Sequence, residues 1–505
     1  MTAASHPRLV RLLLVVLLTS VVGTIPLSAR ADELPARTSE LPSPPSADEA
    51  VSWEAEGTTA TLDHVAEAVR ATRLHERGLT GRGIGVALID TGVAPVVGLT
   101  DVVHGPDISL DSQAEQAQHY DVYGHGTHLA GIITSDRQDA PGLAPDATLL
   151  SVKVGAYNGA VDVSQVIAGI DWVVQHREEH NIRVLVLAYG TDSTQDPLVD
   201  PLSHAVETAW HNGITVVTAA GNDGQVRDSL VNPATNPWVI AVGAVDTQGT
   251  RRVSDDTVAT FSPAGTPARG PDVLAPGVGM VSARVPGGYL DTTFPEAQRP
   301  GDLFRGNGTS QAAAVVGAGV ALMLEDNPSL TPDDVKARIV DGSKVLRQDG
   351  TGEAPGMLNL TQARTSDVIG AQVHLLSSGS GTLEGARGSY HLLGDSPLTG
   401  EQDIFGQPFD SVVWAAEATA LTSWDGGTWN NTEWTGWGWD GWGWDIAEWT
   451  GTTWDGWGWD GWGWDGWGWD GWGWDGWGWD GWGWDGWGWD GWGWDGWGWD
   501  GTQWD

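Results

Sequence analysis

Apolar and polar positions along the middle of the chain predict a repeated strand–helix pattern. Short runs rich in Val, Ile and Ala predict buried strands at 83–89, 183–189, 214–219 and 238–245. Longer segments between and after them predict helices at 163–174, 201–212 and 312–324, and Pro332 with two following acids marks another helix start. Strands that alternate with helices favour a parallel sheet covered on both faces, so we expect an α/β fold.

The first residues have the pattern of a secretory signal. Arg8 and Arg11 precede an apolar run at 12–22, and Ala29-Arg30-Ala31 offers small residues for cleavage. This run is too short for a comfortable membrane span, so cleavage after Ala31 is favoured over a short membrane anchor. We expect a signal peptide at 1–31, an exported protein without disulfides, and a flexible Pro/Glu/Ser-rich arm at 32–63.

Four short motifs follow the predicted strands or precede the last long helix. Asp90 begins Asp-Thr-Gly, His125 opens His-Gly-Thr-His, Asn222 follows Ala-Ala-Gly, and Ser310 stands in Gly-Thr-Ser-Gln-Ala-Ala. Taken singly, they are typical of turns, a metal-binding histidine pair and a helix N-cap. No third ligand with metal spacing accompanies the histidines, and we expect the second, His128, to be structural. Together the four motifs indicate one catalytic site.

Serine, histidine and aspartate are the residue types that acyl transfer needs. A serine hydroxyl is a weak nucleophile at neutral pH, so a base must take its proton during attack. Histidine suits that role because its pKa lies near physiological pH, and a buried carboxylate can fix its tautomer. Preset hydrogen-bond donors must stabilise the oxyanion. The motifs therefore indicate a serine peptidase.

The chain order Asp, His, Asn, Ser resembles that of the subtilase family of subtilisin-like serine peptidases, and the resemblance covers about residues 81–363. It implies a subtilisin-like domain at 64–364 and secreted serine endopeptidase activity. It also implies that Ser310 is the nucleophile, His125 the general base and acid, and Asp90 the carboxylate that orients the imidazole.

The resemblance also assigns the oxyanion and the substrate. The Asn222 side chain and the Ser310 backbone N–H would stabilise the oxyanion. Ala188-Tyr189-Gly190 stands where many members have Ser-Leu-Gly, at a strand edge that pairs with extended substrate. We therefore expect these three residues to bind substrate, and Tyr189 to reshape the groove.

Cofactors and partners follow from the same comparison and from charge. The Asn-rich calcium loop that often follows the histidine motif is not evident at 134–145, so we predict no cofactor, with calcium as the alternative. The formal net charge of −41 repels nucleic acid and anionic membranes. We therefore expect protein or peptide substrates and no nucleic-acid partner.

The last part of the chain is a repeat with a five-residue period. All but four of the 33 tryptophans lie from Trp414 onward, and the segment after Arg387 holds 21 acids and no Lys or Arg. We expect a Gly/Ser-rich connector at 365–421, flexible around 377–381, and a low-complexity Trp/Gly/Asp tail at 422–505. An odd period does not suit a flat strand, which leaves a chain of tight turns, a narrow solenoid or disorder.

Several functions suit such a tail. Trp stacks on sugar rings, so one hypothesis is an array that binds glycans or the cell envelope. Another is a sticky segment that anchors or self-associates, and a third is calcium binding. The sequence thus predicts a secreted or surface-associated serine endopeptidase localised by its tail. The alternative is a surface-adhesion or structural protein whose peptidase domain is inactive or only self-processing.

Overall fold

The structure, a computed structural model, describes residues 59–114, 117–224, 229–346, 355–393, 397–434 and 448–449. All of these belong to one of the two units into which the chain divides, Pro44–Asp505. The predicted signal peptide, most of the predicted arm and the uniform part of the repeat tail lie outside the described residues. No helix among the described residues is both long enough and apolar enough to cross a bilayer.

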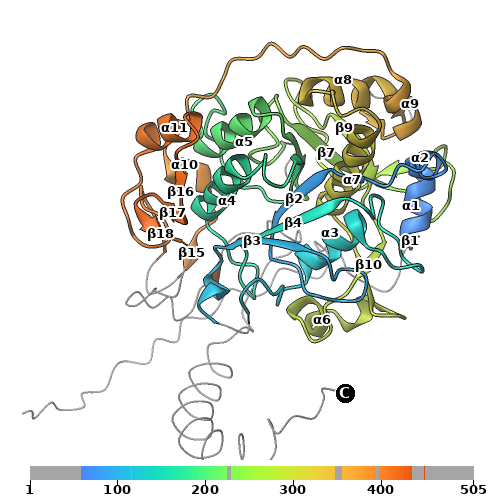
Figure 1. Ribbon diagram of the computed structural model, residues 1–505, viewed down its shortest axis with the longest axis horizontal. Coiled ribbons are helices and arrows are strands. Elements are labelled where there is room, and N and C mark those ends of the chain that lie inside the picture. The colour runs from blue at the N-terminus through green and yellow to red at the C-terminus, as the bar shows by residue number, and fades with distance from the viewer. Residues whose placement is uncertain are drawn as a thin grey trace, which may run out of the picture. The chain divides into compact units, whose positions relative to one another are not determined.

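Within the described part of the chain, a ten-stranded sheet forms the centre of the fold (Figure 1). Its strand order is β13-β14-β9-β7-β6-β5-β2-β4-β3, and β8 pairs with β7. Neighbours from β14 to β3 run parallel, whereas β13 and β8 pair antiparallel. The strands are β2 (Gly85–Asp90), β3 (Val103–Asp107), β4 (Thr148–Lys153), β5 (Ile182–Leu187), β6 (Thr215–Ala219), β7 (Ile240–Asp246), β8 (Thr257–Val258), β9 (Val273–Pro276), β13 (Lys344–Val345) and β14 (Gly356–Met357).

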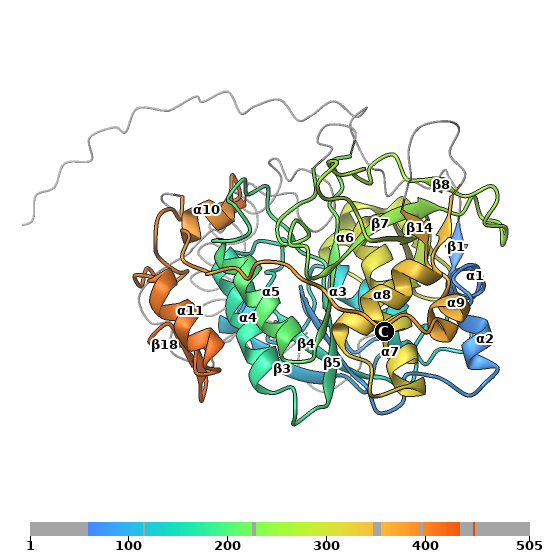
Figure 2. The ribbon, with the colours of Figure 1, turned by 90° about the horizontal axis from the view of Figure 1, so that it is seen from above.

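Helices cover the sheet on both faces (Figures 1 and 2). On one face, α3 (His125–Thr134) packs against α7 (Thr309–Asp326), and α7 contacts the central strands β5, β6 and β7. On the other face, α4 (Val163–Gln175) packs against α5 (Pro201–His211), beside β2 and β6. Further on, α8 (Pro332–Gly342) packs against α9 (Leu360–Thr365). The sheet is therefore closed to water on both sides.

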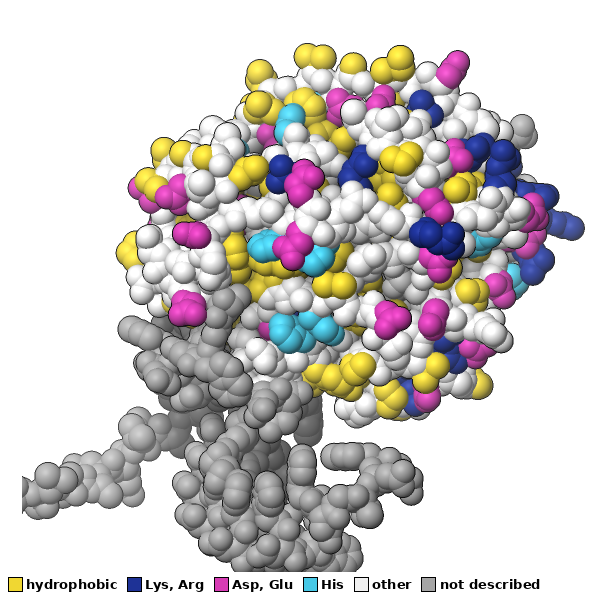
Figure 3. All heavy atoms as spheres, in the orientation of Figure 1, with side chains coloured by type: hydrophobic (Ala, Val, Ile, Leu, Met, Phe, Trp, Pro, Cys, Tyr) yellow, Lys and Arg dark blue, Asp and Glu magenta, His cyan; other side chains and the backbone are white. Residues whose placement is uncertain are grey.

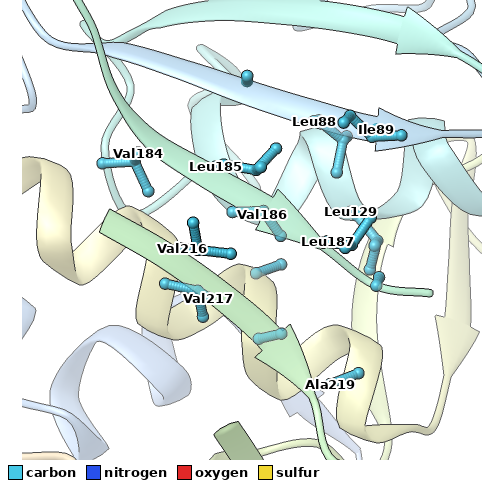
Figure 4. Close-up of a cluster of buried hydrophobic side chains, with 14 of the residues drawn as sticks. Leu88, Ile89, Leu129, Val184, Leu185, Val186, Leu187, Val216, Val217 and Ala219 are labelled. Atoms are coloured by element: carbon cyan, nitrogen blue, oxygen red, sulfur yellow. The ribbon is translucent and has the colours of Figure 1, made fainter. Parts of the chain in front are cut away.

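The buried strands explain the continuous apolar runs in the sequence. Every residue of β2 is buried, and Leu88, Ile89, Val186 and Val217 are each at most 1% exposed. Figure 4 shows them in one cluster with other side chains of β5 and β6 and with Leu129 of α3. Residues buried on both faces of a parallel sheet have no polar side to present, so the hydrophobic pattern does not alternate. The core thereby fixes the carboxyl ends of β2, β5 and β6 relative to one another.

A second, four-stranded sheet lies beside the main one. Its order is β1-β10-β12-β11, with β10 antiparallel to β12. These strands and the remaining short helices of the same region are β1 (Ala60–Thr61), β10 (Met280–Ala283), β11 (Gln298–Arg299), β12 (Leu303–Gly306), α1 (Leu62–Ala68), α2 (Ala71–His75), η1 (Leu110–Gln113), α6 (Tyr289–Thr293) and η2 (Pro295–Ala297).

The chain after α9 packs against α4 and α5. Residues 366–382 form no helix or strand and run across α8 and α5 (Figures 1 and 2). Ser377 N donates to Glu207 Oε2 at 2.7 Å, within the run that was expected to be flexible. Figure 3 shows hydrophobic side chains along the edge where this segment runs, and Val373 is 91% exposed.

The connector then forms folded elements that contact the enzyme. They are α10 (Leu383–Arg387), β15 (Leu392–Leu393) and α11 (Ser411–Thr419), and β15 pairs with β19 (Glu448–Trp449). α10 contacts α4 and α5, and α11 contacts α5. The helices of the connector therefore pack on the enzyme.

The first repeat copies form a three-stranded meander of β16 (Trp424–Asp425), β17 (Thr428–Trp429) and β18 (Thr432–Glu433). Two-residue loops join the strands, with positive φ at Gly426 and Gly427 (57° and 97°) and at Asn430 and Asn431 (46° and 61°). Positive φ at both loop residues is the geometry of tight β-hairpin turns. In these copies the odd period thus corresponds to a chain of tight turns.

The strands and helices predicted from the apolar pattern are confirmed with small shifts of their ends. The predicted strand 83–89 is β2, and the predicted helix 312–324 lies inside α7, which begins three residues earlier at Thr309. The α/β fold, with a parallel sheet covered on both faces, is confirmed as well.

Candidate active site

Asp90 and His125 meet at the carboxyl end of β2. Asp90 is the last residue of β2, and His125 is the first residue of α3. His125 Nδ1 lies 2.8 Å from Asp90 Oδ1, and both side chains are at most 1% exposed. Such a buried contact fixes the ring orientation and holds a proton on Nδ1, which leaves Nε2 as the ring nitrogen that can accept one.

The close approach of α3 to β2 requires Gly126. A Cβ at this position would overlap the carbonyl oxygen of Gly92 and would lie 3.0 Å from Asp90 Oδ1. The backbone N–H of Gly126 donates to Thr91 Oγ1 at 2.9 Å. The glycine after His125 therefore lets the start of the helix lie directly against the Asp90 loop.

Asp121 connects the loop after Asp90 to the start of α3, a role that the sequence did not predict. Its Oδ1 accepts from Thr91 Oγ1 at 2.8 Å and from Gly124 N at 2.7 Å, and its Oδ2 accepts from Thr127 N and Oγ1. Burial raises the pKa of this carboxyl, and the hydrogen bonds from Gly124 and Thr127 oppose that rise. The carboxylate ties the Asp90 loop to the start of α3. A lone Asp four residues before the His motif carries no sequence signal of that role.

Ser310 lies in the first turn of α7. The side chain is buried, and its Oγ is 3.5 Å from the carbonyl oxygen of Ala188, which follows β5. Because a helix N-terminus carries unpaired N–H groups and partial positive charge, this position favours negative charge on the serine and on an adjacent oxyanion. The effect comes from the first turn of α7, in which Ser310 is the second residue.

Asn222 is held in place by the residue before Ser310. Its Oδ1 accepts from the Thr309 backbone N–H at 2.9 Å, and Thr309 Oγ1 also lies 3.1 Å from it. The Thr309 hydroxyl also accepts from the Gly221 N–H at 3.2 Å, and it lies 3.1 Å from the carbonyl oxygen of Gly221. With Oδ1 occupied in this way, the Nδ2 group remains as the donor end of the amide, next to Gly308. The residues assigned to the oxyanion are thus adjacent.

A pocket lies between the ends of β5 and β6. The three residues expected to bind substrate contribute to its wall, together with Asn222. The described residues that line it are Ala188, Tyr189, Gly190, Ala219, Gly221, Asn222, Asp223, Val231, Thr309 and Tyr390. Burial raises the pKa of the Tyr189 hydroxyl well above its usual range, and the negative charge of Asp162 adds to the rise. Tyr189 therefore stays neutral at the pocket wall.

The second histidine of the His motif is buried in the protein. His128 is 1% exposed, and its Nε2 lies 3.2 Å from the carbonyl oxygen of Phe304. Burial, together with the nearby His125, lowers the pKa of His128 to about 4. It is therefore neutral at ordinary pH. In the described part of the chain, no group of three or more His, Asp or Glu side chains is arranged to hold a metal ion.

The chain is similar to known proteins of one family. The profile of the subtilase family matches residues 81–365, more than half of the chain. The chain is 36% identical to serine protease AprX of Bacillus subtilis over 305 residues, which cover 56% of this chain and 67% of that protein. It is 30% identical to subtilisin DY of Bacillus licheniformis, over 58% of this chain and 96% of the relative.

A solved structure is also similar. It is a cold-adapted subtilisin-like serine proteinase, 28% identical, with a TM-score of 0.44, and the match covers 56% of this chain and 90% of that one.

The chain belongs to the subtilase family. It is a subtilisin-like serine endopeptidase, and its substrates are proteins or peptides.

Proposed function

We propose that this endopeptidase cleaves peptide bonds with Ser310 as nucleophile, His125 as general base and acid, and Asp90 as the orienting carboxylate. The observation that carries the proposal is the 2.8 Å contact between Asp90 Oδ1 and His125 Nδ1 at the end of β2. It is supported by the contact of α3, which begins at His125, with α7, which carries Ser310 near its start.

The chemistry follows from these positions. Ser310 Oγ attacks the scissile carbonyl carbon while His125 Nε2 takes its proton, and Asp90 stabilises the imidazolium that forms. The Asn222 Nδ2 and the Ser310 N–H donate to the oxyanion of the tetrahedral intermediate. His125 then gives the proton to the leaving amine, and the acyl group stays on Ser310. Water then attacks the carbonyl carbon of this ester while His125 takes a proton from it. His125 gives that proton to Ser310 Oγ, which releases the acid and restores the serine.

The competing hypothesis is an adhesion or structural protein with an inactive or only self-processing peptidase domain. The buried Asp90–His125 contact and the ordered supports around it, Asp121 and Thr309, favour an active enzyme. An inactive domain has no need to keep a carboxylate and an imidazole paired in the core, since burying polar groups costs free energy.

We also propose that residues 1–31 direct export and that the repeat tail localises the enzyme. In the described part of the tail, Trp424, Trp429 and Trp434 are at most 4% exposed, so their rings are not available to an external ligand. Binding to glycans or the cell envelope therefore falls to the copies beyond Trp434, which lie outside the described residues apart from 448–449.

The decisive experiment compares wild-type protein with Ser310→Ala. We expect the wild type to react with a fluorophosphonate probe and to digest casein, and the variant to do neither while keeping the same melting temperature. Digestion of casein by Ser310→Ala at the wild-type rate would exclude Ser310 as the nucleophile. A folded wild type that neither reacts nor digests would favour the adhesion hypothesis.

A further inference from the structure

One wall of the pocket comes from outside the part of the chain that matches the family. Tyr390 lines the same pocket as Ala188, Asn222 and Thr309. The family profile ends at residue 365, so Tyr390 lies 25 residues beyond it. The segment after the peptidase domain therefore contributes directly to the surface next to the proposed nucleophile.

The segment that carries Tyr390 is joined to the loop that follows β5. Thr191 Oγ1 donates to the carbonyl oxygen of Ala386, and Ser193 Oγ donates to that of Gly385, both at 2.6 Å. On the other side, the Ser389 N–H and Oγ donate to the two oxygens of Asp192, again at 2.6 Å each. Four hydrogen bonds thus hold the residues on either side of Arg387 against this loop after β5.

Gly388 allows this close approach. Its φ is 65°, and a Cβ there would overlap Asp192 Oδ1. A residue with a side chain would push Ser389 away from Asp192. Because Tyr390 follows directly, such a shift would also move its ring away from the pocket.

A buried ion pair fixes the same segment to α4. Arg387 Nε lies 2.6 Å from Asp162 Oδ2, and both side chains are 0% exposed. The other guanidinium nitrogens donate to the carbonyl oxygens of Gly400 and Gln402. Asp162 is itself the N-cap of α4 and accepts from Ser164 N. The guanidinium therefore joins α10, the chain near residue 400 and the start of α4 in one cluster, three residues from Tyr390.

Several residues opposite Tyr390 are small, and among them are Ala188, Gly190 and Gly221. Val231 lies directly over Gly190 and Gly221, because a Cβ on either glycine would overlap its side chain. Among the lining residues that the structure describes there is no Lys or Arg, and Asp223 is the one acid. An aromatic ring added to such walls narrows the space for a substrate side chain without offering it a charge.

We propose that residues 383–390 complete the substrate pocket, and that Tyr390 limits it to peptides with a small, apolar side chain on the amino side of the cleaved bond. This inference rests on the proposed function, because the pocket receives that side chain only if Ser310 is the nucleophile. Tyr390 is then a specificity-determining residue supplied by the C-terminal segment.

The test uses the full-length protein and three peptides that differ only in that side chain, Ala, Leu or Phe. Tyr390→Ala should raise the ratio of kcat/KM for Phe over Ala by about tenfold, the scale on which pocket size discriminates between apolar side chains. Tyr390→Trp should lower the same ratio. Tyr390→Phe, the matched control, should leave it unchanged because the ring remains. Active enzyme is counted in each case with the fluorophosphonate probe.

The outcomes separate this inference from the proposed function. If Tyr390→Ala and Tyr390→Trp react with the probe but both keep the wild-type ratio of kcat/KM for Phe over Ala, the role of Tyr390 is overturned while the proposed function stands. A uniform rise for all three peptides in Tyr390→Ala would also overturn it, since that result indicates a blocking contact. If Tyr390→Ala does not fold, the direction of change in Tyr390→Trp decides. A wild type without probe reaction would remove the proposed function first.

Discussion

The indole Nε1 of Trp429 lies 2.7 Å from Oδ2 of Asp171, a buried carboxylate on α4. The Nε1 of Trp414 donates to the same oxygen at 2.8 Å. One acid of the peptidase domain thus binds a residue of α11 and a residue of the repeat meander. The chain therefore connects the enzyme to the beginning of its tail through a specific polar contact as well as through apolar packing.

This contact predicts a pH dependence of stability. Burial raises the pKa of Asp171 to about 6, although hydrogen bonds from Trp414 and Trp429 oppose the rise. Because the folded protein holds this proton more tightly than the unfolded chain, Asp171 lowers the free energy of unfolding as pH rises from about 4 to about 6. Asp171→Asn should remove this decrease and stabilise the protein at pH 7 by about 1–3 kcal/mol, because its carbonyl can still accept both indoles.

The measurement is urea unfolding of the wild type and the variant at several pH values between 4 and 8. Asp425→Asn, an exposed acid on neighbouring β16, is the matched control and should leave the pH profile unchanged. A wild-type profile that is flat between pH 4 and 6, or an Asp171→Asn profile that keeps the same slope, would contradict the prediction.

The buried ion pair between Arg387 and Asp162 predicts a large loss of stability when one partner is removed. Arg387→Met would leave the Asp162 carboxylate buried without its partner, which typically costs about 3–5 kcal/mol. The exposed pair Arg73–Glu76, with side chains 65% and 56% exposed, provides the control. Arg73→Met should change the free energy of unfolding by less than about 1 kcal/mol. Similar losses in chemical unfolding for both variants would show that the buried pair has no special role.

The motifs made the proposed catalytic residues predictable because each motif encodes a local structure. Asp90 ends an apolar run that is buried on both faces, and Ser310 lies in the first turn of a long apolar helix, so the apolar runs and the motifs together placed both residues at the ends of their elements. Asp121 joins Thr91, thirty residues away, to the start of α3, and Tyr390 lines a pocket with residues far from it in the sequence. A single acid or tyrosine outside a periodic pattern leaves no trace of such a contact in the sequence.

The connector is a second case in which the sequence did not predict contacts made after folding. Its Gly and Ser residues predicted flexibility, but hydrogen bonds to partners some 170–190 residues away, such as those of Ser377 and Thr382, hold it against the enzyme. Local composition measures how freely a segment moves in isolation. It does not record what the segment binds after folding, so tertiary contacts decided the outcome here.

The oxyanion assignment predicts a specific kinetic defect. Asn222→Ala should lower kcat by about 10²–10³-fold with little change in KM, a size typical for loss of one oxyanion donor in this family. Thr309→Val should have a smaller effect of the same kind. It removes the hydroxyl that lies 3.1 Å from Asn222 Oδ1 but keeps the backbone N–H that donates to the same oxygen. Thr309→Ser, which keeps the hydroxyl, is the control. If KM rose in Asn222→Ala while kcat held, Asn222 would bind substrate in its ground state instead.

The position of Trp434 predicts where the tail ceases to support the fold. Trp429 and Trp434 are each 1% exposed and pack edge to face, with ring centroids 5.0 Å apart. Removal of a buried Trp side chain costs about 3–5 kcal/mol. Of the described residues, a variant that ends at Trp434 loses just the two-residue strand β19, so it should melt close to the wild type and keep peptide hydrolysis, whereas one that ends at Leu421 should melt earlier. The first variant should also lose retention on cell-envelope fragments in a pull-down, since every later copy is gone.

Equal retention of this variant and the full-length protein would exclude the later copies as the anchor. An equal melting temperature for both truncations would show that the meander adds no stability.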